Sequence, residues 1–267
     1  MNSFQKNFPE DCRRIRAASP LVLNITNYVA MNFSANALLA AGASPLMSSE
    51  PSEMKELVSL CNSLVINIGC LDSTQIKAMK IAAECASDMH KPWVLDPAGA
   101  GASVLRTETA TLLSSLGPSV IRGNASEMLS LCGGKASGRG VDSTEESACA
   151  VRAAKHLALK YGCIVSVSGA SDYITDGHAT VCIHNGNPLM TKVTAMGCVA
   201  SAMTAAFCAV NGNSLEAAAE AMALMGVTGE RACVECKGTG SLQTVFLDML
   251  CSHVPEETAA EIKSEII

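Results

Sequence analysis

Short aliphatic runs alternate with segments of helical periodicity along most of the chain. The aliphatic runs predict buried strands at Leu21–Ile25, Ser63–Ile68, Trp93–Leu95, Ser119–Ile121 and Cys163–Val167. Between them, apolar residues recur at the helical period, which predicts helices at Met31–Ala41, Ser73–Met89, Ala125–Leu131 and Ser143–Lys160. Ser73 is the expected N-cap of its helix. Aliphatic strands separated by helices are typical of a mostly parallel sheet that is covered on both faces.

The second half of the chain adds a hairpin and a group of helices. Asp176-Gly177 separates two β-like runs, Tyr173–Thr175 and Ala179–His184, and predicts a hairpin turn. Helices are then expected at Gly197–Val210, Ser214–Cys233 and Ser241–Cys251, with a last one in the charged tail Val254–Ile267. The chain contains no long linker and no internal repeat. We therefore expect one α/β domain over residues 1–267, with a three-layer αβα arrangement in which helices cover both faces of a mostly parallel central sheet.

Composition and charge exclude several classes of protein. Hydrophobic residues make up 49% of the 267 residues and charged residues 16%, which favours a large ordered core over disorder. The formal net charge of −6 disfavours nucleic-acid binding, because no basic field would release counterions from phosphates. The longest apolar stretch, Ala195–Val210, is shorter than the roughly 18 to 20 residues that span a bilayer. We expect neither nucleic acid nor membrane as a partner.

Thirteen cysteines do not predict a disulfide scaffold here. Their number is odd, the chain is long, and the segment Met1–Ala18 is charged, without the apolar region of a secretory signal. Most of them lie in apolar runs, where cysteine behaves as a small hydrophobic residue. We therefore expect a reducing, cytoplasmic location. The five histidines show no i, i+4 pair, so the sequence does not favour a histidine metal site or a triad.

The segment Thr194–Cys198 is the strongest candidate for chemistry. It opens a long helix of small residues, and the first amides of a helix have no partner within the helix. Together with the helix dipole, these amides favour an anion such as a phosphate. Cys198 would lie at the mouth of such a site, where the helix terminus would lower the pKa of its thiol. A buried helix cysteine without function is the alternative interpretation.

Other polar groups follow the predicted strands and would collect at the same edge of the sheet. Asp96 is a candidate ligand of Mg²⁺, or a residue that merely caps a turn. Arg122 suits phosphate oxygens and Glu127 a metal or a water, although the two would also make an ordinary surface pair. Ser168 and Gly169 would hold nucleotide phosphates or simply form a turn. The chain has no Walker-type P-loop and no nucleophile elbow.

Taken in order, these motifs resemble the hydroxyethylthiazole kinases, which have the ribokinase-like fold. The resemblance covers nearly the whole chain and rests on Asn24–Asn27, Asn32-Phe33 with Asn36, Gly42–Met47, Asn67–Gly69, Asp96–Gly101, Arg122–Glu127, Lys192–Thr194 and Gly197-Cys198. Each motif is weak alone, but their order and spacing together are specific.

The resemblance implies transfer of the ATP γ-phosphoryl group to 4-methyl-5-(2-hydroxyethyl)thiazole, with Mg²⁺, in a homotrimer whose substrate pockets lie between subunits. It also implies a role for individual residues. Cys198 and Gly197 would be catalytic, and Cys198 matches the position where sugar kinases of this fold carry an aspartate base. The other implied positions are Asn27, Met47, Gly69 and Ala195 for the thiazole, Arg122, Asn124 and Ser168 for ATP, and Asp96 and Glu127 for Mg²⁺.

The anion turn departs from the family pattern at one point. Many members have Gly where this chain has Ala195, and alanine adopts a positive φ less easily than glycine. Three alternatives remain open at this stage. The first is a ribokinase-like kinase for another small alcohol such as hydroxymethylpyrimidine. The second is a non-catalytic nucleotide-binding oligomer, and the third is a structural oligomer built on the alanine-rich helices.

Overall fold

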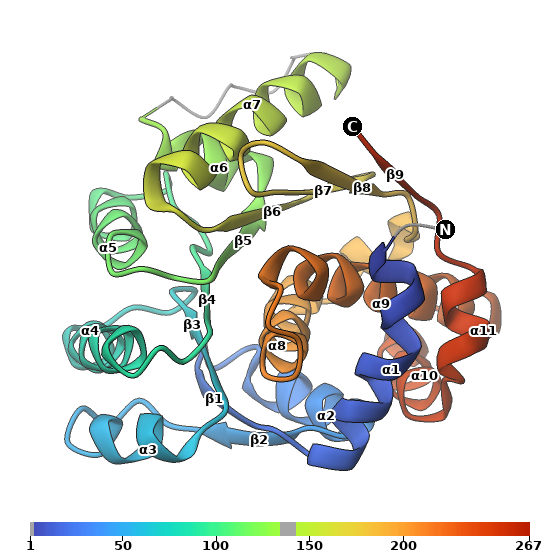
Figure 1. Ribbon diagram of the computed structural model, residues 1–267, viewed down its shortest axis with the longest axis horizontal. Coiled ribbons are helices and arrows are strands. Elements are labelled where there is room, and N and C mark those ends of the chain that lie inside the picture. The colour runs from blue at the N-terminus through green and yellow to red at the C-terminus, as the bar shows by residue number, and fades with distance from the viewer. Residues whose placement is uncertain (1–2, 134–142) are drawn as a thin grey trace.

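The computed structural model describes residues 3–133 and 143–267, and these form a three-layer αβα fold around one sheet (Figure 1). The strands lie in the order β2-β1-β3-β4-β5-β6-β7-β8-β9. Their bounds are Leu21–Ile25 for β1, Ser44–Met47 for β2, Ser63–Asn67 for β3, Trp93–Asp96 for β4, Val120–Asn124 for β5, Ile164–Ser168 for β6, Asp172–Thr175 for β7, Thr180–Ile183 for β8 and Ser264–Ile266 for β9. Strands β1 to β6 pair in parallel, and the remaining pairs are antiparallel.

Helices cover both faces of the sheet, as predicted (Figure 1). One layer consists of α3 (Met54–Leu60), α4 (Ser73–Asp88), α5 (Val104–Ser114), α6 (Ala125–Leu131) and α7 (Ser143–Tyr161). The other consists of α1 (Ser3–Ala18), α2 (Met31–Ala41), α8 (Met196–Cys208), α9 (Ser214–Glu235), α10 (Thr239–Ser252) and α11 (Pro255–Ala260). Each layer packs a separate hydrophobic cluster against the sheet. A 3₁₀ turn, η1 (Pro188–Lys192), precedes α8.

The predicted strands and most predicted helices are confirmed, and the differences have local causes. The N-cap of α4 is Asp72 and not Ser73, because the Asp72 side chain accepts a hydrogen bond from the Gln75 amide. The tail does not form one helix over 254–267. After the short helix α11 it pairs with β8 as β9, since a free sheet edge offers hydrogen-bond partners that sequence periodicity cannot reveal.

Helices α1, α3 and α5 and strand β2 are not among the predicted elements. Helix α1 is amphipathic: it is charged on one face and buries Phe4, Phe8 and Ile15 on the other. Strand β2 is an edge strand of four residues that contains Pro45, and an edge strand tolerates proline. Strand β5 continues through Asn124, so Arg122 lies within the strand and not after it.

The order of the strands fixes where a ligand can bind. The chain moves from β1 outward to β2 and then returns to the other side of β1 with β3, so the strand order reverses between β1 and β3. In open parallel sheets, ligands bind beyond the carboxyl ends of the strands at such a reversal. The segments that follow Ile25 and Asn67 therefore flank the expected crevice.

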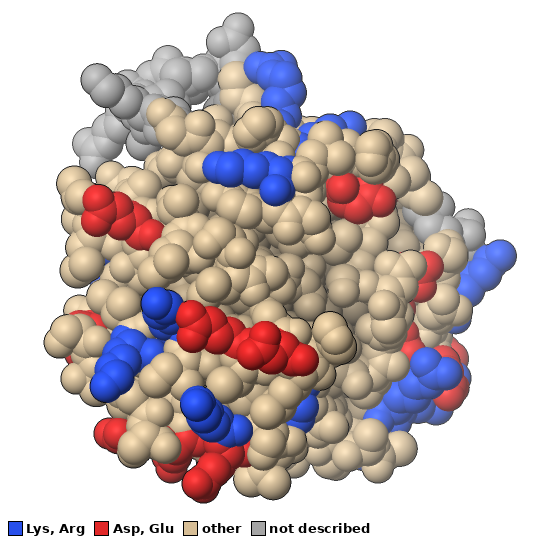
Figure 2. Space-filling view, turned by 60° about the vertical axis from the view of Figure 1, so that its left-hand side comes forward, with Lys and Arg blue, Asp and Glu red and all other residues tan. Residues whose placement is uncertain are grey.

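Membrane spans, disulfides and surface charge bear on the class of protein. No helix among the described residues is long and apolar enough to cross a membrane. All thirteen cysteines lie within the described ranges as free thiols. On the face shown in Figure 2, acidic and basic side chains are interspersed, and no continuous basic field is visible on that face of the described chain.

Candidate active site

A network of buried side chains joins the carboxyl ends of β1, β3 and β4 to the first turn of α8. Asn27 follows β1 and donates from Nδ2 to Asn67 Oδ1 at 2.9 Å and to Cys198 Sγ at 3.3 Å. Asn67 ends β3 and donates to Cys198 Sγ at 3.2 Å and to Asp96 Oδ2 at 2.6 Å. Residues that are 171 positions apart in sequence thus lie in direct contact at the reversal of strand order.

Asp96 supplies the carboxyl group of this network, and its side chain is buried. It is 3% exposed, and its Oδ2 also accepts a hydrogen bond from Ser201 at 2.8 Å. Burial raises the pKa of Asp96 to about 6, while Arg122 opposes the shift and Glu127 adds to it. Both hydrogen bonds go to Oδ2, which leaves Oδ1 for a ligand. A cation at this point would relieve the burial of the charge.

The thiol of Cys198 does not have the lowered pKa that the helix terminus suggested. Burial raises the pKa of Cys198 to about 11, and the carboxyl of Asp96 adds to this shift. The amides of Asn27 and Asn67 and the Arg122 guanidinium act in the opposite direction but do not outweigh burial. At pH 7 only about one thiol in 10⁴ would therefore be ionised. The expectation of a lowered pKa is wrong, because burial is the largest influence on this thiol.

The N-terminus of α8, where an anion site is predicted, has no side-chain cap. Its N-cap, Ala195, offers no side chain to the first amides. Arg122 lies beside this turn and donates from Nη1 to the carbonyl of Gly197 at 3.0 Å. Its Nε is buried and has no hydrogen-bond partner among residues 3–133 and 143–267. A buried unpaired donor is costly in a folded protein, so the guanidinium is suited to an anionic ligand.

Glu127 and Asn124 form the N-terminal cap of α6. Asn124 accepts from the Glu127 amide at 3.0 Å, and Glu127 Oε2 accepts from the Asn124 amide at 2.8 Å, which is a capping box. Glu127 Oε1 also accepts from the Gly99 amide at 2.9 Å. The Glu127 carboxylate is therefore held beside the loop that follows Asp96, and the Asn124 side chain serves the helix cap.

Two glycines in the site are required by close contacts. A Cβ on Gly69 would lie 2.7 Å from Asn27 Nδ2 and 2.8 Å from Asn67 Oδ1. A Cβ on Gly197 would lie 2.8 Å from Arg122 Nη1. Arg106 connects the loops after β3 and β4, since it donates hydrogen bonds to the carbonyls of Ile68, Gly69 and Ala98. Any larger residue at 69 or 197 would displace the amide network or the guanidinium.

Ala195 has a strained backbone, as the departure from the family pattern suggested. Its φ is +67°, in the left-handed region that costs a residue with a Cβ about 1 kcal/mol more than glycine. We predict that Ala195→Gly raises the free energy of unfolding by about 1 kcal/mol, measured by urea denaturation. Ala209→Gly, in the right-handed region just after the same helix, is the matched control and should lower it. Equal losses in both variants would contradict the assignment of strain.

The remaining predicted residues lie at the same edge, with different degrees of contact. Met47 ends β2 and is half-buried. Ser168 ends β6 and donates to the carbonyl of Gly123 at 3.3 Å, which places it between β5 and β6. The interpretations of Met47 as a substrate contact and Ser168 as an ATP contact stay predictions.

Sequence reasoning does not select three buried polar residues of this edge as site residues. Asn67 lies in the motif Asn67–Gly69, in which only Gly69 is assigned a role. Ser201 is not singled out, although it lies three positions after Cys198 on the same face of α8. Asp172 accepts a hydrogen bond from the Gly169 amide at 3.0 Å, and burial raises its pKa to about 6. A polar residue on an otherwise apolar strand or helix face is the signal that could have found Asn67 and Ser201.

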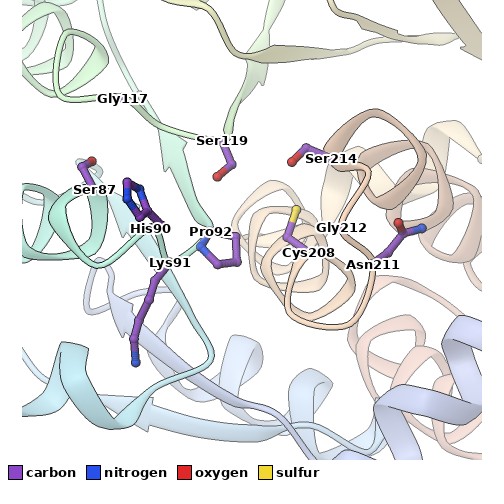
Figure 3. Close-up of a pocket in the computed structure, with 10 residues that line it drawn as sticks. All are labelled: Ser87, His90, Lys91, Pro92, Gly117, Ser119, Cys208, Asn211, Gly212 and Ser214. Carbon is purple, nitrogen blue, oxygen red and sulfur yellow. The ribbon is translucent and has the colours of Figure 1, made fainter.

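Two other features lie outside this site. A cavity of about 380 Å³ is lined by the turns before β4 and β5 and the end of α8, including His90, Ser119 and Cys208 (Figure 3). It lies at the amino ends of the strands, away from the network. At the sheet edge, Cys182, His184 and Glu265 bring three potential metal ligands within 4.8 Å of one another. There His184 is hydrogen-bonded to Ser171 and Glu265, which accounts for the cluster without an ion.

Solved structures with similar folds include a pyridoxal kinase and a ribokinase-like superfamily protein. A pyridoxal kinase of Staphylococcus aureus, solved with AMP-PCP and pyridoxal, aligns with a TM-score of 0.61 at 13% identity, over 93% of this chain and 98% of the other. A ribokinase-like superfamily protein of Enterococcus faecalis aligns with a TM-score of 0.63 at 16% identity, over 91% of this chain and 88% of the other. Likeness at such identity establishes the fold alone. The chain therefore has the fold of these ribokinase-like proteins.

The chain belongs to the hydroxyethylthiazole kinase family, whose model matches residues 12–257. A hydroxyethylthiazole kinase of Oleidesulfovibrio alaskensis is 51% identical over 89% of this chain and 90% of its own length. One of Brachyspira hyodysenteriae is 44% identical over 98% of this chain and its whole length. The structure of a hydroxyethylthiazole kinase protein from Pyrococcus horikoshii aligns with a TM-score of 0.90 at 37% identity, over 98% of this chain and 99% of the other.

Proposed function

We propose that this protein transfers the γ-phosphoryl group of ATP to the hydroxyl of 4-methyl-5-(2-hydroxyethyl)thiazole. Membership of a kinase family implies ATP as co-substrate. The observation that carries the proposal is the cluster of Asn27, Asn67, Asp96 and Cys198 beside the open N-terminus of α8. An anion site next to a pocket lined by amides and a thiol is suited to phosphoryl transfer to a small alcohol.

Phosphoryl transfer requires alignment and neutralisation of charge more than covalent participation by the protein. In the proposed mechanism the first amides of α8 hold the transferring group, and Arg122 adds positive charge beside them. Asn27 and Gly69 line the alcohol side, together with Met47 and the backbone of Ala195. Cys198 orients the hydroxyl, because a thiol with a pKa of about 11 is rarely ionised at neutral pH.

Asp96 and Glu127 are the residues that would hold Mg²⁺. Their donor chemistry fits, since Mg²⁺ prefers carboxylate oxygens. Among the described residues Asp96 Oδ2 has two hydrogen-bond partners and Oδ1 has none. When bound, Mg²⁺ neutralises charge on the phosphates. The Glu127 oxygens already accept backbone amides, so Glu127 is more suited to contact the ion through water than directly.

We also propose that the protein acts as a homotrimer with substrate pockets between subunits, and that it works in the cytoplasm. Large apolar side chains are exposed beside the site, at Tyr28 (65%) and Val29 (62%), in the loop between Asn27 and α2. Their burial by a neighbouring copy would be favourable. Light scattering of the purified protein tests the trimer directly.

The function is tested by an ATP-dependent phosphorylation assay with Mg²⁺ and a panel of small alcohols. The thiazole alcohol should be the preferred acceptor, with hydroxymethylpyrimidine and pyridoxal as competitors in parallel. Preference for hydroxymethylpyrimidine would replace the substrate assignment. Nucleotide binding without transfer to any alcohol would favour the non-catalytic alternative.

Two variants of Cys198 separate orientation from base catalysis. We predict that Cys198→Ala lowers kcat by about 10²-fold or less and leaves the KM for the alcohol nearly unchanged. A thiol that only orients the hydroxyl should raise the rate by no more than the smallest effects of acid–base catalysis, about 10²-fold. Cys198→Asp should remain active, because Asn27 and Asn67 can donate to a carboxylate as they do to sulfur. Steady-state kinetics measures both. A folded but inactive Cys198→Ala protein would contradict the orienting role.

A further inference from the structure

The side chain of Asn67 has every hydrogen-bonding position occupied. Its amide nitrogen donates to Asp96 Oδ2 at 2.6 Å and to Cys198 Sγ at 3.2 Å. Its oxygen accepts from Asn27 Nδ2 at 2.9 Å and from the Gly69 amide at 2.9 Å. An asparagine side chain offers two donors and two acceptor sites, so none is left over. Asn67 is only 1% exposed, and water does not compete for these positions.

This arrangement fixes the orientation of the amide. If the side chain turned over, its NH₂ group would face two donors, Asn27 Nδ2 and the Gly69 amide, and its oxygen would face the Asp96 carboxylate. Both hydrogen bonds to its oxygen would be lost, and that oxygen would repel the carboxylate. The Asn67 N–H groups therefore always point at Asp96 and Cys198.

The fixed amide of Asn67 affects the sulfur of Cys198, which accepts hydrogen bonds from both Asn27 and Asn67. A neutral thiol has one hydrogen to donate, and its sulfur is a weak acceptor. With two amides pointing at the sulfur, the S–H hydrogen turns away from them, toward the partly exposed side of the residue. If the thiol ionises, the same two amides stabilise the charge.

We propose that Asn67 is a positioning residue that sets the orientation and the ionisation of the Cys198 thiol, and that couples this thiol to Asp96. The proposal rests on the proposed phosphoryl transfer to an alcohol, in which Cys198 faces the hydroxyl. Asn67 itself does not touch the reacting atoms. It acts because a single rigid amide bridges the carboxylate and the sulfur.

The test is a double-mutant cycle with Asn67→Leu and Cys198→Ala. Leucine branches at Cγ as asparagine does but donates no hydrogen bond. In the native background, kcat for the thiazole alcohol should fall about tenfold, the effect of one hydrogen bond. In the Cys198→Ala background the fall should be less than roughly threefold, because residues that act through each other are not additive. Equal falls in both backgrounds would overturn the proposal.

A second measurement needs no turnover and so separates this proposal from the proposed function. The alkylation rate of Cys198 by iodoacetamide at pH 9, followed on its peptide by mass spectrometry, should fall about tenfold in Asn67→Leu, since loss of an amide donor raises the thiol pKa. An unchanged rate would overturn the proposal even if the native protein phosphorylates the thiazole alcohol. Failure of the native protein to phosphorylate any alcohol would overturn the function alone.

Two variants control for folding. Val65→Ala changes a buried residue on the same face of β3, two positions before Asn67, and has no polar contact with the thiol. It should lower thermal stability without changing the alkylation rate. If Asn67→Leu does not fold, Asn67→Ser keeps a polar group in the strand while losing both donated hydrogen bonds, and it carries the same two expectations.

Discussion

Asp96→Asn is expected to lower kcat by roughly 10³-fold while the protein remains folded. The substitution keeps the shape of the side chain and removes the charge that is proposed to hold Mg²⁺. Because burial raises the pKa of Asp96 to about 6, its charge at pH 7 makes the folded protein less stable relative to the unfolded chain. The neutral amide removes that penalty, so the melting temperature should stay the same or rise. Steady-state kinetics and thermal melting measure the two effects.

The matched control is Asp88→Asn at the exposed end of α4, which should change neither quantity. Loss of activity together with a large loss of stability would show that Asp96 has a structural role through Asn67 and Ser201. Full activity of Asp96→Asn would exclude this carboxylate from the reaction.

Glu220→Gln is expected to stabilise the protein at alkaline pH. Glu220, in α9, is fully buried beside Asp11 of α1, which is 2% exposed. Burial, and then the neighbouring Asp11, raise the pKa of Glu220 to about 9 from its ordinary 4.5. A carboxyl whose pKa is higher in the folded state takes up a proton on folding. Its contribution is therefore complete below pH 4.5 and is lost as the pH rises toward 9.

The effect should be large, because each pH unit within that window changes the free energy of unfolding by up to about 1.4 kcal/mol. At pH 8 we expect Glu220→Gln to be more stable than the native protein by on the order of 3 kcal/mol, and the gain should shrink toward pH 5. Urea denaturation at pH 5, 6.5 and 8 measures this. Glu235→Gln, exposed at the end of the same helix, should show no such trend. A pH-independent loss in Glu220→Gln would contradict the assigned cause.

Much of the fold could be predicted because its signals are local. Strands such as Leu21–Ile25 and Ser63–Asn67 are aliphatic throughout, since both of their faces are buried, and Asp176-Gly177 marks the hairpin between β7 and β8. Helices α1, α3 and α5 escaped prediction because their apolar residues face a partner that the sequence does not show. The tail could not be predicted, since β9 exists only by pairing with β8.

The site divides in the same way. Asp96, Arg122 and Cys198 stand out in the sequence because polar residues after parallel strands, and an uncapped helix start, collect at one edge of the sheet. The sequence could not show that Glu127 and Asn124 cap a helix, or that Asn67 binds both Asp96 and Cys198. It also suggested the wrong direction for the Cys198 pKa, since burial is a property of the packed chain.

The sequence by itself thus determined the class of fold, the family resemblance and the edge of the sheet where the chemistry collects. The class of fold and the edge follow from periodicity and from residue type at strand ends, which are local properties, and the resemblance follows from the order and spacing of motifs along the chain. Only the tertiary structure decided that burial raises the pKa of the Cys198 thiol, that Ala195 takes a strained φ of +67°, and that a buried asparagine joins the thiol to the carboxylate. Those depend on desolvation and on contacts between segments as much as 171 residues apart, which no local pattern encodes.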